Sequence, residues 1–411
     1  MAPAQQAAPQ ARQPGQPDRM PFVLVTAGFW STFDRFAMTT VLVAIADGFH
    51  TRLSAAVAVA SAYFLAYGCL QPVWGMLSDR FGRVRVLRLA LAGALVGGVV
   101  SAVAPSLTVL LVARALTGAC YGGVNPTSVT YVGDIVPADA VKRALSPFYA
   151  GGGLGVATGI ALGGIIVSAA SWRYVFVLPA AAALVLIVVT GRLPEPAHSP
   201  PGKPLAQIAA VLRSGPAMLV ILCGFLMGAV VLGCVTFLPA LLQHHGASAS
   251  VAGLISAVFG LAGLGWSLVY SMLTPHVPRW GLTGIGGALA TAALLVAATG
   301  GRLSTVVVAA ALLGGGWMFT NSSLASRAAT VLPQVRGTMV SLYVTGMFVG
   351  GGVAPALATG PADRGEYSVV FLTGACVAVL VTLLASLSDL RLGARSEAGR
   401  AQQHHPVSER R

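Results

Sequence analysis

The chain alternates long apolar stretches with short polar or charged ones, and each apolar stretch is close to the length of a membrane-spanning helix. A helix needs about 20 apolar residues to cross the hydrocarbon core of a bilayer. In the first half such stretches cover residues 22–45, 55–74, 86–103, 107–132, 145–169 and 174–190, and in the second half they begin near residues 216, 251, 282, 305, 338 and 368. The pattern predicts an all-α membrane protein with twelve transmembrane helices.

Composition agrees with this prediction and bears on topology. Of the 411 residues, 56% are hydrophobic and only 9% are charged, whereas soluble domains carry about 25% charged residues. The net charge of +13 is not gathered in one basic domain, because most lysines and arginines lie in the terminal segments and between apolar stretches on one side. The positive-inside rule places that side in the cytoplasm. We therefore expect a multi-pass protein with both termini in the cytoplasm and without a nucleic-acid partner.

Shifts in composition mark the expected domain boundaries. Residues 1–20 are rich in proline, glutamine and alanine and predict a disordered cytoplasmic tail. Residues 191–215 contain five prolines and a short apolar stretch at 205–212 that predicts a surface helix, so this segment reads as a cytoplasmic linker. The expected domains are therefore an N-terminal six-helix bundle at 21–190, a C-terminal six-helix bundle at 216–390 and a C-terminal cytoplasmic tail at 391–411.

The two halves of the sequence are related by an internal duplication. Adding 196 to positions in the first half superposes Gly28-Phe29 on Gly224-Phe225, Gly118 on Gly314 and Asn125 on Asn321. After a three-residue deletion the offset becomes 193, which superposes Gly153 on Gly346 and Gly159 on Gly352. A parallel repeat of two six-helix halves is one of the architectures found in secondary transporters.

The stretch from Gly75 to Leu87 concentrates charge between two apolar stretches, with one acidic and three basic residues. Charge at bilayer depth is costly, so we expect a loop on the cytoplasmic side. The spacing G-x-L-x-D-R-x-G-R-x-x-x-L resembles the loop between helices 2 and 3 of the major facilitator superfamily. The resemblance implies two pseudo-symmetric bundles that rock about a central site. It also implies a conformational latch formed by Gly75, Asp79, Arg80, Gly82 and Arg83.

Asp34 is the one acidic residue well inside a predicted span, and Arg114 lies inside another. The stretch Leu110–Gly118 has the pattern L-x-x-x-R-x-x-x-G, which resembles a superfamily motif whose arginine lines the cavity and takes part in proton coupling. Burial disfavours a charged carboxylate and a nearby cation favours it, so a carboxylate facing Arg114 changes its proton affinity when its surroundings change. We expect Asp34 and Arg114 to couple protons. A permanent structural ion pair, or Asp34 at the cavity mouth with Arg35, are the alternatives.

Polar and aromatic residues at helical spacing predict a substrate cavity between the halves. Residues 114, 118, 121, 125 and 128 share one helix face, and residues 317 and 321 repeat the aromatic residue and asparagine in the second half. The asparagines could instead join neighbouring helices by hydrogen bonds. The expected cavity residues are Trp30, Phe33, Met38, Tyr121, Asn125, Phe225, Trp317, Asn321 and Tyr343.

Four glycines recur at every fourth position, a spacing that lets another helix approach closely: Gly151, Gly155, Gly159 and Gly163. The run G-x-x-x-G-I-x-x-G-G resembles a motif of the twelve-helix drug:proton antiporters, with Ile160 in place of a proline. The resemblance implies proton-coupled efflux of a small organic or drug-like compound. Proton-coupled uptake of a small metabolite is the alternative, followed by a membrane sensor that does not transport.

No catalytic, nucleotide-binding or metal-ligand motif is visible in the sequence, so we expect neither an enzyme nor a bound cofactor, with the proton gradient as the energy source. The five cysteines stand singly in apolar stretches and predict neither a disulfide framework nor a metal site. Membrane lipid and a small-molecule substrate are the expected partners of a monomeric protein. The 23 arginines against 2 lysines, with many alanines and glycines, favour a bacterial cytoplasmic membrane.

Overall fold

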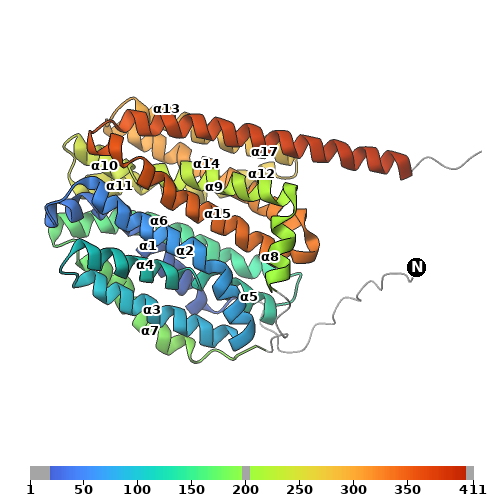
Figure 1. Ribbon diagram of the computed structural model, residues 1–411, viewed down its shortest axis with the longest axis horizontal. Helices are drawn as coiled ribbons and strands as arrows, with labels where there is room; N and C mark the ends of the chain where they lie inside the picture. The colour runs from blue at the N-terminus through green and yellow to red at the C-terminus, as the bar shows by residue number, and fades with distance from the viewer. Residues whose placement is uncertain (1–18, 197–203, 404–411) are drawn as a thin grey trace, which may run out of the picture.

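The computed structural model describes residues 19–196 and 204–403, and in these ranges every regular element is a helix. The first half lies below the second in Figure 1. It contains α1 (Phe22–Gly48), α2 (Leu53–Phe81), α3 (Arg83–Ala102), α4 (Leu107–Tyr121), α5 (Val124–Ile135), α6 (Val141–Ala169) and α7 (Tyr174–Thr190). The short α8 (Pro204–Leu212) follows the linker, where a surface helix was predicted at 205–212.

The second half repeats this arrangement with more interrupted helices. It contains α9 (Gly215–Val235), α10 (Leu238–His244), α11 (Ala249–Ser256), α12 (Val258–Leu273), α13 (Arg279–Ala298), α14 (Leu303–Val331), the 3-10 turn η1 (Pro333–Val335), α15 (Arg336–Leu357), α16 (Thr359–Asp363) and α17 (Tyr367–Gln403). Several spans therefore consist of two consecutive helices, such as α4 with α5 and α9 with α10.

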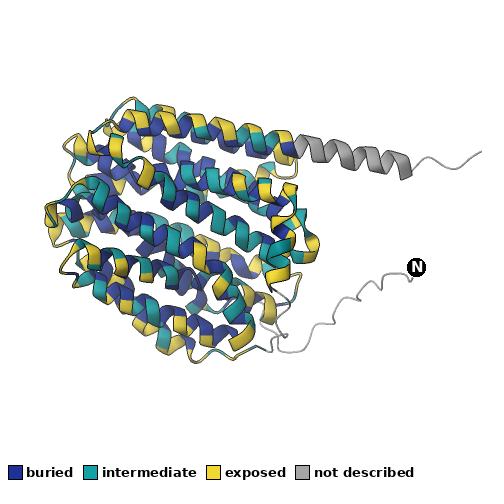
Figure 2. Cartoon of the chain, viewed as in Figure 1, coloured by how far each residue is buried: buried dark blue, intermediate teal, exposed yellow. Residues whose placement is uncertain are grey.

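Twelve helical segments of the described ranges, some made of two consecutive helices, have about the length of a membrane span. Ten helical segments in the described chain are long and apolar enough to cross a bilayer, and α7 is a shorter apolar helix of 17 residues. The 27-residue α1, which carries Asp34 and Arg35, completes the set. Large apolar side chains such as Leu89, Val112 and Leu268 are exposed. Figure 2 shows exposed residues along the outer helices. The predicted twelve-helix membrane fold is confirmed.

Two expectations about element ends are wrong. The stretch 75–87 is not an extended loop, because α2 continues to Phe81 and α3 starts at Arg83, with only Gly82 between them. Gly82 has a φ of +100°, which glycine adopts without the strain of a Cβ atom. At the other end of the chain the last span does not end at residue 390, because α17 continues to Gln403 into the expected tail at 391–411. Of the tail predicted at residues 1–20, residues 1–18 lie outside the described residues, as do residues 404–411.

The duplication is visible in matching helix contacts. A Cβ added to Gly118 would overlap the carbonyl oxygen of Tyr63, and one added to Gly314 would lie 2.5 Å from that of Phe259. Both members of the second pair follow the first by 196 residues, so the expected offset holds for these spans.

The second expected offset needs a correction. Gly155 packs against the carbonyl oxygen of Phe29, and Gly350 packs against that of Phe225. Phe225 follows Phe29 by 196 residues, while Gly350 follows Gly155 by 195, not 193. The expected offset is too small by two residues. Glycines are so frequent in these helices that a nearby glycine also matches at the wrong offset.

The halves meet along α2 with α15 and along α6 with α11 and α12, and they are joined at one end. We call this the far end, and the end that carries Gly82 the latch end. At the far end the backbone N–H of Ser54 donates to Asp363 Oδ1 (2.8 Å), and that of Ser250 donates to Ser168 Oγ (2.8 Å). In the middle, a Cβ on Gly68 would lie 2.8 Å from Phe348 Cβ.

One of these pairs, α2 with α15, separates toward the latch end. A Cβ added to Gly75 on α2 or to Gly337 on α15 would meet no atom within 4 Å. Because α2 and α15 are in contact near Gly68 but leave open space at Gly75 and Gly337, the two halves diverge toward this end. The halves are therefore joined at the far end, while α2 and α15 lie apart at the latch end.

Candidate functional site

Asp34 and Arg114 form a buried, bidentate ion pair in the first half. Arg114 Nη1 donates to Asp34 Oδ1 at 3.0 Å, and Arg114 Nη2 donates to Asp34 Oδ2 at 2.6 Å. The side chain of Asp34 is 1% exposed and that of Arg114 is 0% exposed. Two parallel hydrogen bonds between a planar guanidinium and a carboxylate give the strongest and most directional form of such a pair. The two residues sit near the middle of α1 and α4, so their charges neutralise each other deep inside the bundle.

Aromatic rings enclose the guanidinium of Arg114. Its Cζ atom lies 4.7 Å from the ring centre of Tyr63 on α2 and 4.7 Å from that of Phe176 on α7. A cation above the face of an aromatic ring is attracted by the ring's quadrupole. Sequence analysis did not assign Tyr63 or Phe176 to the site, since their proximity to Arg114 depends on how three helices pack.

Arg35 is adjacent to Asp34 but does not join the pair. Its side chain is buried, at 7% exposure, and its Nε and Nη1 atoms have no hydrogen-bond partner. Instead its Cζ atom lies 4.8 Å from the ring centres of both Tyr67 and Phe348 and 5.3 Å from that of Phe36. Phe348 belongs to α15, so Arg35 contacts the second half of the protein.

The predicted cavity residues are distributed among several environments. Tyr343 Oη donates to Asn321 Oδ1 at 3.0 Å, which brings two of them together in the second half. The buried Oδ1 of Asn125 has no partner. Tyr121 Oη donates to the carbonyl oxygen of Pro179 at 3.1 Å, so this ring faces α7 within the first half. The other predicted cavity residues differ in burial: Trp30, Phe225 and Trp317 are partly buried, and Phe33 and Met38 are buried.

The glycine stripe brings α6 against α1. Cβ atoms added to Gly155 and Gly159 would lie 2.6 Å from the carbonyl oxygens of Phe29 and Phe33 respectively. Gly163 approaches Ala37 O, at 3.0 Å from an added Cβ, and Gly151 approaches a side-chain carbon of Val25 at 3.1 Å. These backbone approaches hold α1, and with it Asp34 and Arg35, at a fixed distance from α6.

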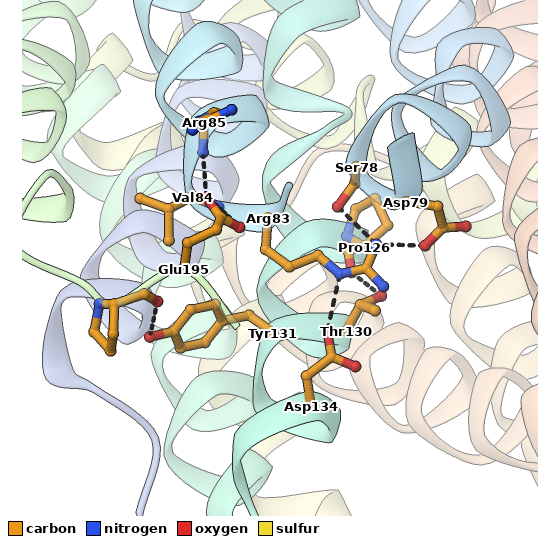
Figure 3. Close-up of polar contacts among 11 residues, drawn as sticks. Ser78, Asp79, Arg83, Val84, Arg85, Pro126, Thr130, Tyr131, Asp134 and Glu195 are labelled. Atoms are coloured by element: carbon orange, nitrogen blue, oxygen red, sulfur yellow. Dashed lines mark hydrogen bonds and ion pairs between the residues drawn. The ribbon is translucent and has the colours of Figure 1, made fainter. Parts of the chain in front are cut away.

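Two of the expected latch residues, Asp79 and Arg83, belong to a polar network within the first half (Figure 3). Arg83 Nε donates to Asp134 Oδ2 at 2.9 Å, and Arg83 Nη1 donates to Ser78 Oγ at 3.2 Å and also to Asp79. Arg80 is exposed and lies over the ring of Phe81. Asp79 keeps 48% of its side chain exposed at the latch end.

Glu195 from the linker completes this network. Its carboxylate accepts hydrogen bonds from the backbone N–H groups of Val84, at 3.1 and 3.2 Å, and Arg85, at 3.3 Å. These groups are at the N-terminus of α3, where unpaired N–H groups favour a negative charge. Tyr131 Oη donates to the carbonyl oxygen of Pro194, which holds the same part of the linker (Figure 3). Sequence analysis missed Glu195, although it is the single acidic residue in the segment 191–215.

Within the described ranges no group of three or more His, Cys, Asp or Glu side chains is arranged to hold a metal ion.

Comparisons with known proteins agree with this architecture. The chain is 34% identical over 153 residues to the efflux pump dotC of Dothistroma septosporum, covering 37% of this chain and 26% of that protein. It is 31% identical over 118 residues to multidrug resistance protein 3 of Bacillus subtilis, covering 29% of this chain and 23% of that protein. These matches span only about a quarter of each relative's length.

A solved structure extends the likeness to nearly the whole fold. The crystal structure of a D-xylose-proton symporter superposes with a TM-score of 0.69 at 18% identity, over 88% of this chain and 95% of that one. The family model described as Major Facilitator Superfamily matches residues 24–355. With that match over most of its length and a twelve-helix fold, the chain belongs to the Major Facilitator Superfamily of membrane transporters.

Proposed function

We propose that the protein is a proton-coupled secondary transporter that exports a small organic compound from the cytoplasm by alternating access. The observation that carries this proposal is the fully enclosed, bidentate pair of Asp34 and Arg114. An ionisable group at this depth in a membrane protein is costly and rare, and it is therefore a candidate functional group. A carboxylate that is paired with one enclosed cation can exchange this partner for a proton when the surrounding helices move.

Protonation of Asp34 and the arrangement of the helices depend on each other in this mechanism. A neutral Asp34 would leave Arg114 as an uncompensated buried charge, which costs about 3–5 kcal/mol. Water or substrate must then reach Arg114, and this requires the surrounding helices α1, α2, α4 and α7 to open. Proton binding is thereby linked to a change in helix packing, as coupling requires.

The joined far end and the separation of α2 and α15 at the latch end correspond to one of the two states of an alternating-access cycle. If the latch end faces the cytoplasm, as the positive charges predict, this state receives a compound from inside the cell. In the opposite state the second half would approach Gly75 and the exposed Asp79. The hydrogen bonds of Arg83 to Asp79 and Asp134, together with Glu195 at the start of α3, would then hold Asp79 in place for contact with α15.

Export and uptake are each supported by a different observation. The names of the relatives dotC and multidrug resistance protein 3 support export. Proton-coupled uptake is favoured by the charges of Asp34, Arg35 and Arg114, which we call the buried charge cluster. It contains one negative and two positive groups, so protonation of Asp34 raises its net formal charge from +1 to +2. Such a cluster would bind a proton and an anion together.

Energised inside-out vesicles containing the protein can test the proposal. Their interior is acidified by respiration, and an acidity-sensitive dye reports proton loss when a panel of organic compounds is supplied. Compounds that release protons when added outside indicate antiport, and compounds that do so only when loaded inside indicate symport. Asp34→Asn should abolish the response in either case. A protein that inserts normally, yet moves no proton with any compound, would instead support a membrane sensor.

A further inference from the structure

Arg35 is a buried cation, and two of its three guanidinium nitrogen atoms have no hydrogen-bond partner. Its side chain is 7% exposed, and neither Nε nor Nη1 has a partner. Its sequence neighbour Asp34 directs both carboxylate oxygens to Arg114 and so does not neutralise Arg35. A guanidinium that is removed from water and left without hydrogen bonds costs free energy unless another group supplies acceptors.

Arg35 contacts the ring of Tyr67, and Tyr63 is stacked on Tyr67. The buried hydroxyl groups of Tyr63 and Tyr67 also have no hydrogen-bond partner. The two tyrosine rings are stacked with their centres 6.1 Å apart, and the ring of Tyr67 lies 4.4 Å from that of Phe348. Cation–π contacts with Tyr67 and Phe348 offset part of the cost of burying Arg35, but aromatic faces do not satisfy its N–H groups.

A carboxylate matches this arrangement. It only accepts hydrogen bonds, it pairs with a planar guanidinium through two of them, and it would neutralise the net +1 charge of the buried charge cluster. A cationic ligand would raise the positive charge, and a neutral ligand would leave it unchanged. Phe348 of α15 and Tyr67 of α2 offer flat apolar surfaces from both halves, so an anion bound here would touch both moving parts of the protein.

We propose that Arg35, with the hydroxyl groups of Tyr63 and Tyr67, binds the carboxylate of the transported compound, and that Tyr67 and Phe348 pack against its apolar or aromatic body. This assignment rests on the proposed transport function in one respect, namely that the ligand is the transported compound. It makes the substrate class organic anions in either direction of transport. A guanidinium that only joins the two halves through Phe348 is the competing explanation, and it predicts no preference for anions.

Equilibrium binding to the purified full-length protein tests the assignment without requiring transport. The probes are benzoate, naphthalene-2-carboxylate and octanoate, each compared with its neutral amide. Binding is measured as the ligand-dependent rise in melting temperature and as the dissociation constant. We expect at least one carboxylate to bind at least tenfold more tightly than its amide. Equal binding of acid and amide, or no binding of any carboxylate at millimolar concentration, would overturn the proposal.

Variants assign the preference to Arg35. Arg35→Gln should remove the difference between carboxylate and amide, and Arg35→Lys should keep part of it because the charge remains without the planar fork. Arg302→Gln, which neutralises an exposed arginine at the start of α14, should bind like the wild type. If Arg35→Gln keeps the full preference, the proposal fails. If Arg35→Gln does not fold, the affinities of Arg35→Lys and of the wild type for each acid and its amide still test the proposal.

Separate failures are distinguishable. Loss of the anion preference in a protein that still moves protons through Asp34 would refute only the substrate class. Arg35-dependent binding of a carboxylate without any proton movement would refute the proposed proton coupling and leave the anion site in place.

Discussion

Both carboxylate oxygens of Asp34 accept hydrogen bonds from the guanidinium of Arg114, at 3.0 and 2.6 Å, and neither side chain is reached by solvent. The contact joins α1 to α4 inside the first half, while Arg35, one residue along α1, contacts Phe348 of the second half. Adjacent residues of one helix therefore connect the candidate proton site to the interface between the two halves. This relationship leads to the first two predictions.

Neutralising Asp34 should affect both coupling and stability. Asp34→Asn removes the titrating group, so we expect transport that no longer depends on the proton gradient. It also leaves Arg114 without its counter-charge, which should lower the free energy of unfolding by about 3–5 kcal/mol. The matched control is Asp47→Asn, an exposed acidic residue at the far end of the same helix. Proton-gradient-dependent flux in reconstituted vesicles and thermal unfolding in detergent are the measurements. Flux of Asp34→Asn that keeps its dependence on pH would contradict the mechanism.

Removing both members of the pair should restore stability without restoring coupling. In Asp34→Asn with Arg114→Gln, no buried charge of the pair is left uncompensated, so the double variant should lose less stability than the two single variants together. Transport coupled to protons should remain absent. A purely structural ion pair predicts the opposite for function, namely coupled transport in the double variant. Unfolding temperatures of all four proteins, with proton flux measured in parallel, separate the two explanations.

The close contact of α6 with α1 should be sensitive to a single methyl group. A Cβ at Gly159 would lie 2.6 Å from the carbonyl oxygen of Phe33, a backbone atom that cannot move independently of its helix. We expect Gly159→Ala to destabilise the protein by about 1–3 kcal/mol through overpacking. Gly152→Ala on the same helix is the control, because its Cβ would meet only Thr32 Oγ1, at 3.8 Å. Equal melting temperatures for the two variants would show that α6 does not need these glycines.

Gly82 should be similarly restrictive at the latch end, but for a conformational reason. Its φ of +100° is strained for any residue with a Cβ, at a cost of about 1–3 kcal/mol. An added Cβ would also lie 2.7 Å from Glu195 Cδ and displace the carboxylate that caps α3. Gly82→Ala should therefore lower both stability and transport rate. Gly133→Ala is the control at the same end, where an added Cβ meets no atom within 4 Å. Wild-type melting temperature and flux in Gly82→Ala would contradict this role.

The sequence predicts the parts of this architecture that depend on local pattern. Twelve spans follow from apolar length, and Asp34 and Arg114 stand out because ionisable residues inside spans are rare. Contacts between distant segments are different. Glu195 reaches the N-terminus of α3 across more than a hundred residues, and Phe348 reaches Arg35 from the other half. No periodicity encodes such proximity, since it depends on how helices are arranged in space.

The direction in which a side chain points also depends on helix breaks that the sequence pattern does not show. Tyr121 shares a helical face with Arg114, but its hydroxyl group donates to Pro179 on α7. The helix is interrupted directly after it, at Gly122 and Gly123, so the face of α4 does not continue smoothly into α5. A single helical wheel drawn through both helices therefore places Tyr121 and Asn125 together on one cavity wall.

A covalent bond across the far end should arrest the transport cycle in the state described. Ser168 Oγ accepts a hydrogen bond of 2.8 Å from the backbone N–H of Ser250, so α6 and α11 are adjacent here. In a variant with the native cysteines replaced, Ser168→Cys with Ser250→Cys should form a disulfide on oxidation. Because alternating access requires the far end to open, the oxidised protein should stop transporting, and reduction should restore the rate.

Each single cysteine variant controls for the substitution, and gel mobility after cleavage in the linker measures the yield of the cross-link. The carboxylate probes should still bind to the oxidised protein, since the latch end remains open. Full transport by the cross-linked protein would show that the far end does not need to separate, and the rocking of two halves would have to be replaced by a smaller local movement.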